Sequence, residues 1–200
     1  MSEQLSLFEI PRRNSPKYSL FLALFPDPRT ARNIINLGNA IRRERGMRGR
    51  LRPVSHLHVS LCGFDGDADV REAVVEFIDS ICKAVVPSMS PFEICFNQVL
   101  SFQNRAGNHP LVLHRDNHDD GAIIRLHGLL HAELAKYAFS NRPHQKFNPH
   151  VTLLYDERQL PVKPIEPVCW TVKEIVLVCS EIGATKYQYL RRWALGPSIR

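Results

Sequence analysis

The chain has 200 residues, of which 44% are apolar and 23% are charged, and its formal net charge is +6 at pH 7. This composition is typical of a folded globular protein and excludes an intrinsically disordered or collagen-like chain. There is no run of 18 apolar residues and no signal-peptide pattern at the start, so we expect neither a membrane span nor a secreted protein.

Residues 1–17 are rich in proline, serine and mixed charge, and we interpret them as a flexible tail before a single bilobal domain over residues 18–200. Within this tail, residues 4–8 (Gln-Leu-Ser-Leu-Phe) resemble the peptides with which bacterial replication and repair proteins bind the DNA sliding clamp. Such peptides are disordered segments that become ordered on binding. The alternative is a tail that packs back onto the folded domain.

The first expected element is a buried strand over Ser19–Phe25, a short apolar run. Asp27 and Pro28 then form a helix N-cap and first turn, and apolar residues at helical spacing predict a helix to about Arg45. The later expected elements are a strand over 56–64, a helix over 70–81, a hairpin of 91–102 with 110–114, a helix over 119–139, a strand over 148–155, a proline-rich loop over 162–167, and strands over 170–179 and 187–195. This mixture indicates an α+β fold or a mixed-sheet α/β fold.

The positive charge is local. Residues 42–52 contain six arginines and one glutamate, a net charge of +5, so the rest of the chain is almost neutral. Arginine is well suited to forked contacts with phosphate. The alternative is a solvated charged face with no partner.

The cysteine pattern points away from disulfide bonds. None of the five cysteines has CxxC spacing, and most lie in apolar runs. This usage is typical of small buried side chains in a reducing cytoplasm. We therefore expect a cytoplasmic protein with neither a disulfide framework nor a structural zinc site.

Two expected strands carry the same pattern of histidine, valine, a hydroxyl residue and leucine, at His58–Leu61 and His150–Leu153. The two copies are separated by nearly half the chain, which suits two similar lobes. Side chains at i and i+2 of a strand share a face, so His58 is expected beside Ser60, and His150 beside Thr152. Two unrelated structural histidines are the alternative, and the match between the copies disfavours it.

Two imidazoles and two hydroxyls in one cleft suit phosphate-ester chemistry without a metal or cofactor. One histidine takes a proton from the attacking oxygen and the other gives a proton to the leaving oxygen, and each role contributes roughly 10²–10⁴ in rate. The pKa of histidine lies near working pH, and hydroxyl donors stabilise charge on the phosphate oxygens.

At these motifs the sequence resembles the two-histidine phosphoesterases, specifically the LigT-like branch of 2'-5' RNA ligases and RNA 2',3'-cyclic phosphodiesterases. Arg52–Val54, Phe21–Leu24 and the segment from Tyr187 to Leu195 also resemble the family, so the similarity covers about residues 18–196. The resemblance implies a bilobal α+β fold in which two pseudo-symmetric mixed or antiparallel sheets flank a central cleft, with the helices outside.

The resemblance also implies an activity: hydrolysis of the 2',3'-cyclic phosphate ends of RNA to 2'-phosphomonoesters, and in some members 2'-5' joining of RNA. It implies His58 as general acid toward the 3' leaving oxygen and His150 as general base for water. The sequence itself does not order these roles, because the matched pair is symmetric. Ser60 and Thr152 are implied to bind the phosphate, and Ser60 stands where many members have threonine.

Four arginines are candidate contacts to RNA or phosphate. Many family members have an arginine close after the second motif, and here Arg158 comes somewhat later. Arg48, Arg50 and Arg52 lead directly into the first motif and are the alternative contacts. The aromatic Phe64 is displaced relative to the family pattern, which weakens the case for base stacking at that position.

Two other functions fit the same residues. One keeps the chemistry but acts on a small cyclic nucleotide or ADP-ribose cyclic phosphate. The other is a nucleotide- or RNA-binding module without catalysis, although binding alone does not need a pair of proton-transfer groups.

Other histidines give weaker signals. His127 and His131 are spaced i, i+4, which suits a metal but more often marks an exposed helix face. The hairpin histidines are expected at the surface, with the flank of the cleft as the alternative; they are His109, His114 and His118. His56 shares a strand face with His58 and is expected at the mouth of the cleft.

Overall fold

The computed structural model describes residues 18–66, 71–104, 107–116, 121–137, 147–181 and 186–197. In chain order the elements are β1 (Tyr18–Leu24), α1 (Pro28–Glu44), η1 (Val54–His56), β2 (Val59–Gly66), α2 (Arg71–Val85), η3 (Val86–Ser88), β3 (Phe92–Ser101), β4 (His109–His114), α3 (Ala122–Ala135), β5 (His150–Asp156), β6 (Lys163–Val172), β7 (Glu174–Glu181) and β8 (Lys186–Ala194). Residues 1–17, which we interpret as a tail, and the clamp-like residues 4–8 within them lie outside the described residues. None of the described helices is long and apolar enough to cross a membrane.

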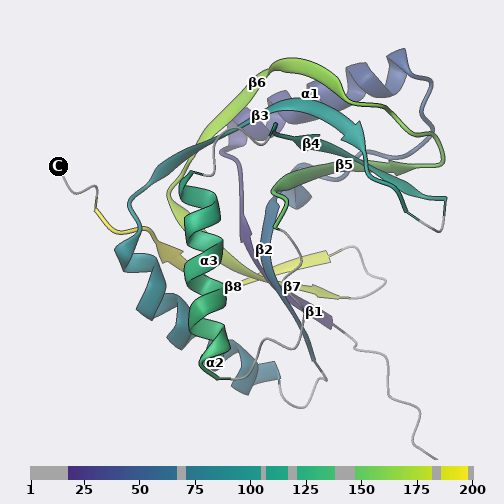
Figure 1. Ribbon diagram of the computed structural model, residues 1–200. Coiled ribbons are helices and arrows are strands. Elements are labelled where there is room, and N and C mark those ends of the chain that lie inside the picture. The colour runs from purple at the N-terminus through teal and green to yellow at the C-terminus, as the bar shows by residue number, and fades with distance from the viewer. Residues whose placement is uncertain are drawn as a thin grey trace, which may run out of the picture.

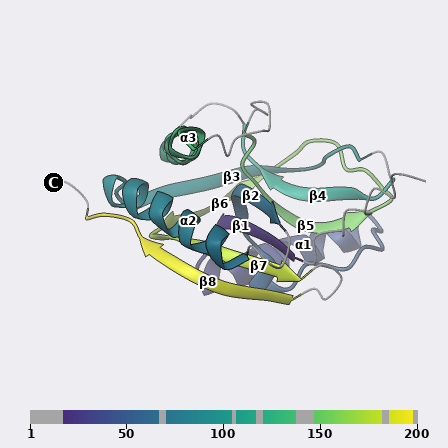
Figure 2. The same ribbon diagram turned by 90° about the horizontal axis from the view of Figure 1, so that it is seen from below.

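The strands form two four-stranded sheets, with the orders β2-β1-β7-β8 and β5-β4-β3-β6, and every neighbouring pair is antiparallel. We call the first sheet lobe 1 and the second lobe 2. Figures 1 and 2 show α2 and α3 together on one side of the molecule and α1 on the other. The expected α+β fold with two sheets and outer helices is confirmed.

The lobes repeat one element. In lobe 1, β1 is followed by α1 and then by β2, which pairs with β1; in lobe 2, β4 is followed by α3 and then by β5, which pairs with β4. The motif strands β2 and β5 are therefore the edge strands of their sheets. Each of these helices packs against the sheet of the other lobe: α1 contacts β5 and β6, whereas α3 contacts β2. This pseudo-two-fold arrangement brings the two motifs to corresponding places.

Helix α1 forms as the sequence predicts. The carboxylate of Asp27 accepts hydrogen bonds from the backbone N–H groups of Arg29 and Thr30 at 2.9 and 3.0 Å, which caps the N-terminus. Ile34 and Ile41 lie on its apolar face, in a continuous core cluster that contains residues of both sheets.

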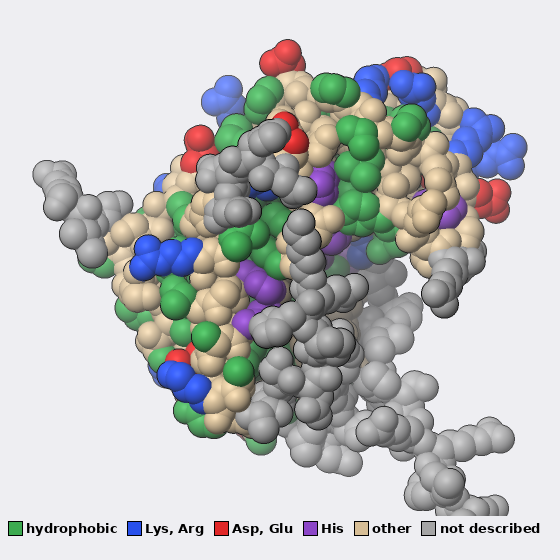
Figure 3. Space-filling view, viewed as in Figure 1, with side chains coloured by type: hydrophobic (Ala, Val, Ile, Leu, Met, Phe, Trp, Pro, Cys, Tyr) green, Lys and Arg blue, Asp and Glu red, His purple; other side chains and the backbone are tan. Residues whose placement is uncertain are grey.

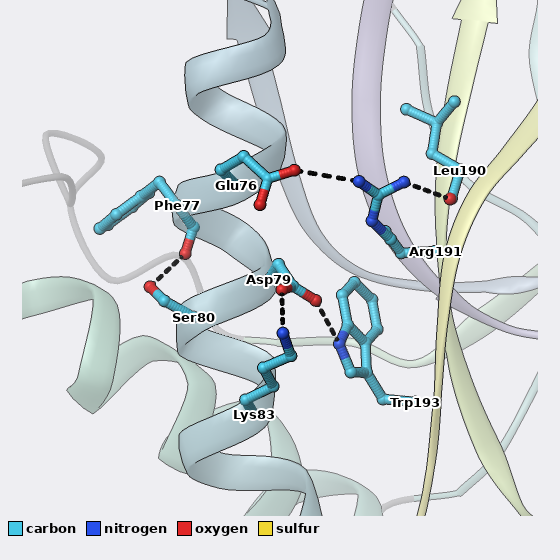
Figure 4. A network of polar contacts seen from close by, with 8 residues as sticks. All are labelled: Glu76, Phe77, Asp79, Ser80, Lys83, Leu190, Arg191 and Trp193. Atoms are coloured by element: carbon cyan, nitrogen blue, oxygen red, sulfur yellow. Dashed lines mark hydrogen bonds and ion pairs between the residues drawn. The ribbon is translucent and has the colours of Figure 1, made fainter.

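Contacts between α2 and β8 brace lobe 1 (Figure 4). The indole N–H of Trp193 donates to Asp79 at 2.9 Å, and Lys83 pairs with the other oxygen of that carboxylate at 2.6 Å. Arg191 pairs with Glu76 at 3.0 Å. The hydrogen bond from Lys83 is the main reason that the pKa of Asp79 is lowered. The buried indole N–H of Trp193 thus has a hydrogen-bond acceptor, which offsets the cost of removing it from water.

Three expected boundaries were wrong. The strand expected at 56–64 begins only at Val59, because residues 54–56 form the short 3₁₀ helix η1. Residues 163–167 of the expected loop belong to β6, and the strand expected over 170–179 is interrupted at Lys173, between β6 and β7. Strand β6 contains Pro164 and Pro167, which an edge strand tolerates because its outer N–H groups have no strand partner.

The expectation of unpaired cysteines was wrong for two of the five. Cys95 of β3 and Cys169 of β6 lie directly opposite each other, with Cα atoms 4.1 Å apart, and form a disulfide. Cys62, Cys82 and Cys179 are buried and form no disulfide, as expected, and burial raises the pKa of Cys62 to about 12. The cysteine pattern therefore gives no argument for a reducing compartment.

Candidate active site

Each motif histidine is held by the same backbone device. Nδ1 of His58 donates to the carbonyl oxygen of His56 at 2.8 Å, and Nδ1 of His150 donates to the carbonyl oxygen of Asn148 at 2.8 Å. A carbonyl oxygen only accepts, so the proton of each neutral ring lies on Nδ1 and leaves Nε2 able to take a proton. Both rings are half-buried.

The hydroxyl residues follow the motif pattern. Ser60 is exposed, and its hydroxyl donates to Nε2 of His58 at 3.0 Å, which confirms that the two side chains share a face. Thr152 is half-buried on β5, two residues after His150.

The structure brings the two motifs together. Strands β2 and β5 contact each other across the lobes. Burial is the main cause that lowers the pKa of His58 to about 4; the hydrogen bond to the His56 carbonyl opposes this, and the positive charges of Arg52 and His150 add to it. The two imidazoles therefore lie within electrostatic reach of each other. Figure 3 shows histidine side chains of the molecule at the surface, near the middle of the view used for Figure 1.

Aromatic rings surround His58. Phe21 stacks on its imidazole with ring centres 4.9 Å apart, and the rings of Phe25 and Tyr187 lie 5.7 Å away. These neighbours were not predicted from the sequence, although strand alternation was a usable signal: Phe21 falls on the face opposite the buried Leu20 and Leu22. Phe64, in contrast, is buried in the core, so it offers no surface for base stacking.

Arg52 is the loop arginine that reaches the first motif. Its guanidinium donates to the Tyr187 hydroxyl at 3.5 Å and to Nδ1 of His56 at 3.4 Å, and its backbone N–H donates to the Leu153 carbonyl at 2.7 Å. His56 is buried and stacks on Tyr187 with ring centres 3.8 Å apart. His56 therefore supports His58 through its backbone carbonyl and, being buried, does not line the mouth of the cleft as expected.

The rest of the arginine loop is fixed to β5 by one carboxylate. Asp156 accepts from the backbone N–H groups of Arg48 and Gly49, both at 2.6 Å, and from that of Arg158 at 2.9 Å. Burial raises the pKa of Asp156, but these three donors outweigh burial and lower it overall. Gly49 is required by close approach, because a Cβ there would lie 2.0 Å from the Tyr155 carbonyl oxygen.

The remaining candidate arginines have different surroundings. The guanidinium of Arg158 donates to the Arg45 carbonyl at 3.1 Å, so it braces the start of the loop and is not placed at the motif histidines. Arg48 and Arg50 are exposed, and their guanidinium groups have no hydrogen-bond or ion-pair partner among the residues that the structure describes. These two are available to a ligand.

The hairpin histidines differ from the surface expectation. His109 is buried and accepts from the backbone N–H of Asn104 at 3.0 Å. His114 is half-buried directly opposite His150 on the neighbouring strand, so it flanks the cleft. His118 lies outside the described residues.

No group of free metal ligands is found in the described part of the chain. The one cluster of three candidate ligands there is Glu93, Cys95 and Cys169, and both sulfurs are in the disulfide. His127 and His131 lie side by side on α3, with ring centres 4.2 Å apart, and belong to no such cluster among the described residues.

The model of the 2'-5' RNA ligase superfamily matches residues 29–182. The chain belongs to this superfamily. A search of curated proteins gave no significant match.

Several solved structures have the same fold. TT0787 of Thermus thermophilus is 20% identical, with a TM-score of 0.71 over 90% of this chain and 99% of that one. E. coli LigT complexed with 3'-AMP is 20% identical, with a TM-score of 0.68 over 90% of this chain and 98% of that one. Kluyveromyces marxianus Usb1 is more distant, with 15% identity and a TM-score of 0.52 over 88% and 98% of the two chains. At this identity the similarity shows the fold.

Proposed function

We propose that this protein is a metal-independent phosphodiesterase that hydrolyses the 2',3'-cyclic phosphate ends of RNA to 2'-phosphomonoesters. One observation carries the proposal: Nδ1 of both motif histidines is bound by a backbone carbonyl, so both rings direct their proton chemistry to Nε2. A binding module needs no such pair. Membership in the 2'-5' RNA ligase superfamily supports an enzyme of the phosphoesterase or RNA ligase class.

In the proposed reaction His150 is the general base and His58 the general acid, as the family resemblance implies. Nε2 of His150 removes a proton from water while the water oxygen bonds to phosphorus. The bond between phosphorus and O3' breaks, and His58 gives its Nε2 proton to that oxygen. The products are a 2'-phosphomonoester and a free 3'-hydroxyl, and both imidazoles then exchange protons with solvent.

The acid role makes a demand on His58. A pKa of about 4 leaves this imidazole mostly neutral at pH 7 when the site is empty. An anionic phosphate bound between His58 and Arg52 favours the imidazolium and offsets the guanidinium charge. Substrate binding would therefore favour protonation of His58, as its role as the acid requires.

Three groups are suited to bind the phosphate. The Ser60 hydroxyl lies 3.0 Å from Nε2 of His58, so it is placed where a phosphate oxygen beside that nitrogen would need a donor. Thr152 has the corresponding position in lobe 2. Arg52, held beside Tyr187, supplies a fixed positive charge.

The arginine loop supports RNA as the substrate over a small cyclic nucleotide. Arg48 and Arg50 extend from a backbone that Asp156 fixes next to the second motif strand. Exposed arginines at a fixed distance from a phosphate site suit the following phosphates of a polyanion. The complexes of E. coli LigT with 3'-AMP and with phosphate support a nucleotide ligand for this fold.

The same site would also serve RNA joining. If the 5'-hydroxyl of a second RNA takes the place of water, His150 removes its proton and attack on phosphorus forms a 2'-5' linkage. The leaving oxygen and the acid remain the same.

The test is turnover of an oligonucleotide with a 2',3'-cyclic phosphate end in EDTA, followed by identification of the product. The proposal expects a 2'-phosphate, and loss of activity in both His58→Asn and His150→Asn. A requirement for added metal, or activity that survives both substitutions, contradicts it. Equal, salt-independent turnover of a cyclic mononucleotide would indicate the small-molecule alternative, and tight binding without turnover would indicate the non-catalytic one.

Two further predictions accompany this function. We propose a cytoplasmic location and an interaction of residues 4–8 with a DNA sliding clamp. A peptide of residues 1–12 that does not bind a sliding clamp would rule out the second.

A further inference from the structure

His150 has a titratable neighbour, His114, directly opposite it on the adjacent strand. Gln98 of β3, His114 of β4 and His150 of β5 are register partners on three adjacent strands. Directly opposite residues of antiparallel strands share a face, with Cβ atoms about 5 Å apart. His114 therefore lies between Gln98 and His150 on the face of the sheet that carries the second motif.

Hydrogen bonds connect these residues to the support of His150. The side-chain amide of Gln98 donates to Nδ1 of His114 at 2.9 Å, and Nε2 of His114 donates to the side-chain oxygen of Asn148 at 2.5 Å. The backbone carbonyl of that same Asn148 accepts from Nδ1 of His150 at 2.8 Å. Phe102 contacts both imidazoles edge-on, with ring centres 5.0 Å from His150 and 5.8 Å from His114.

We infer that His114 is a positioning residue for His150, which acts by fixing Asn148 and thereby the carbonyl that holds the catalytic ring. Asn148 is exposed and lies before the first residue of β5, outside the strand ladder. The bond from His114 ties its side chain to the sheet. Small displacements of a catalytic group cost large factors in rate, which gives such a tie functional weight.

The corresponding place in lobe 1 is occupied differently. Leu24 pairs with Val59, so continuing this register by one residue places Phe25 opposite His58. Phe25 has no hydrogen-bonding side chain, and the support of His58 is fixed instead by Tyr189, which donates to the Ser55 carbonyl at 3.0 Å, and by the stacking of Tyr187 on His56. Among the described residues, a hydrogen bond from an imidazole on the neighbouring strand to the supporting residue is thus found at the second motif and not at the first.

The inference rests on the proposed function for its kinetic test, so a second readout is independent of activity. We compare His114→Leu, which loses the bond to Asn148, with His114→Gln, whose amide nitrogen can replace Nε2 as the donor. His109→Gln is the control, because His109 lies on the same strand opposite Asp156 and away from His150. Thermal unfolding verifies that each variant is folded.

With the cyclic-phosphate oligonucleotide, His114→Leu is expected to lower kcat by about 10- to 100-fold with little change in KM, while His114→Gln and the control stay within about threefold of the parent. In the ¹⁵N NMR spectrum, His114→Leu should reduce the preference of His150 for the Nδ1–H tautomer, and His114→Gln should restore it. Unchanged kcat and tautomer in His114→Leu, or an equal loss in both variants, would overturn the inference. Absence of turnover in the parent with a tautomer change in His114→Leu would contradict the proposed function and leave the positioning role supported.

Discussion

The two motif histidines have the same backbone support and different neighbours. In lobe 1, His58 lies among aromatic rings with the guanidinium of Arg52 nearby. In lobe 2, His150 is next to His114, in a row of polar side chains, and has one aromatic neighbour, Phe102. The repeated strand–helix–strand element supplies two equivalent imidazoles, and their surroundings differ. Burial lowers the pKa of both rings, to about 4 for His58. The different neighbours allow the two rings to take different roles.

Among the residues around the two histidines, the largest effect should come from Arg52→Ala, which removes the guanidinium beside the first motif. Removing a fixed donor to transition-state charge typically costs about 10²–10³ in rate, so kcat/KM for the cyclic-phosphate oligonucleotide should fall by about 100-fold. Arg52→Lys should recover only part, since it keeps the charge but loses the forked donor. Arg191→Ala, at the exposed salt bridge with Glu76 of α2, is the control. Equal losses in Arg52→Ala and the control would contradict a role in the site.

The arginine loop leads into the first motif and is hydrogen-bonded to Asp156 of β5 in lobe 2. Its exposed arginines should strengthen the binding of RNA but not that of a mononucleotide. The double substitution of Arg48 and Arg50 by Ala should weaken binding of the oligonucleotide about 10-fold and reduce the salt slope of log Kd by about 2, because two phosphate contacts are lost. Binding of the cyclic mononucleotide should change little. Fluorescence anisotropy over a salt series measures both, and equal weakening of the two ligands would show that the loop does not follow the RNA backbone.

The features of the two lobes that depend on which strands pair could not be predicted from the sequence. The motif pair, its shared faces and helix α1 were predictable because they depend on residues close in sequence. The disulfide and strand β6 were missed for one common reason: both depend on the pairing of β3 with β6, and the prolines of β6 disguised an edge strand. The position of His114 beside His150 was likewise open, because register across strands is a property of the folded sheet, not of either strand.

A smaller effect is expected on the pKa values of the two motif histidines when phosphate binds. Bound phosphate should raise the pKa of His58 above about 4, because an anion beside the ring stabilises the imidazolium. Burial also lowers the pKa of His150, and the charge of His114 adds to it, so phosphate should raise that value too. NMR titration of the two rings with and without inorganic phosphate measures both. A pKa of His58 that stays near 4 in the phosphate complex would contradict its role as the acid and reverse the assignment.

The most direct test of an unequal pair is the response of the two single variants to the leaving group. A nucleoside 2'-(p-nitrophenyl) phosphate gives the same 2'-phosphomonoester, but its leaving phenolate needs no proton, so the acid becomes dispensable and the base does not. His58→Ala should lose about 10²–10⁴ in rate on the cyclic phosphate and recover most of it on the p-nitrophenyl ester, whereas His150→Ala should stay impaired on both. Equal recovery of both variants, or of neither, would contradict the account.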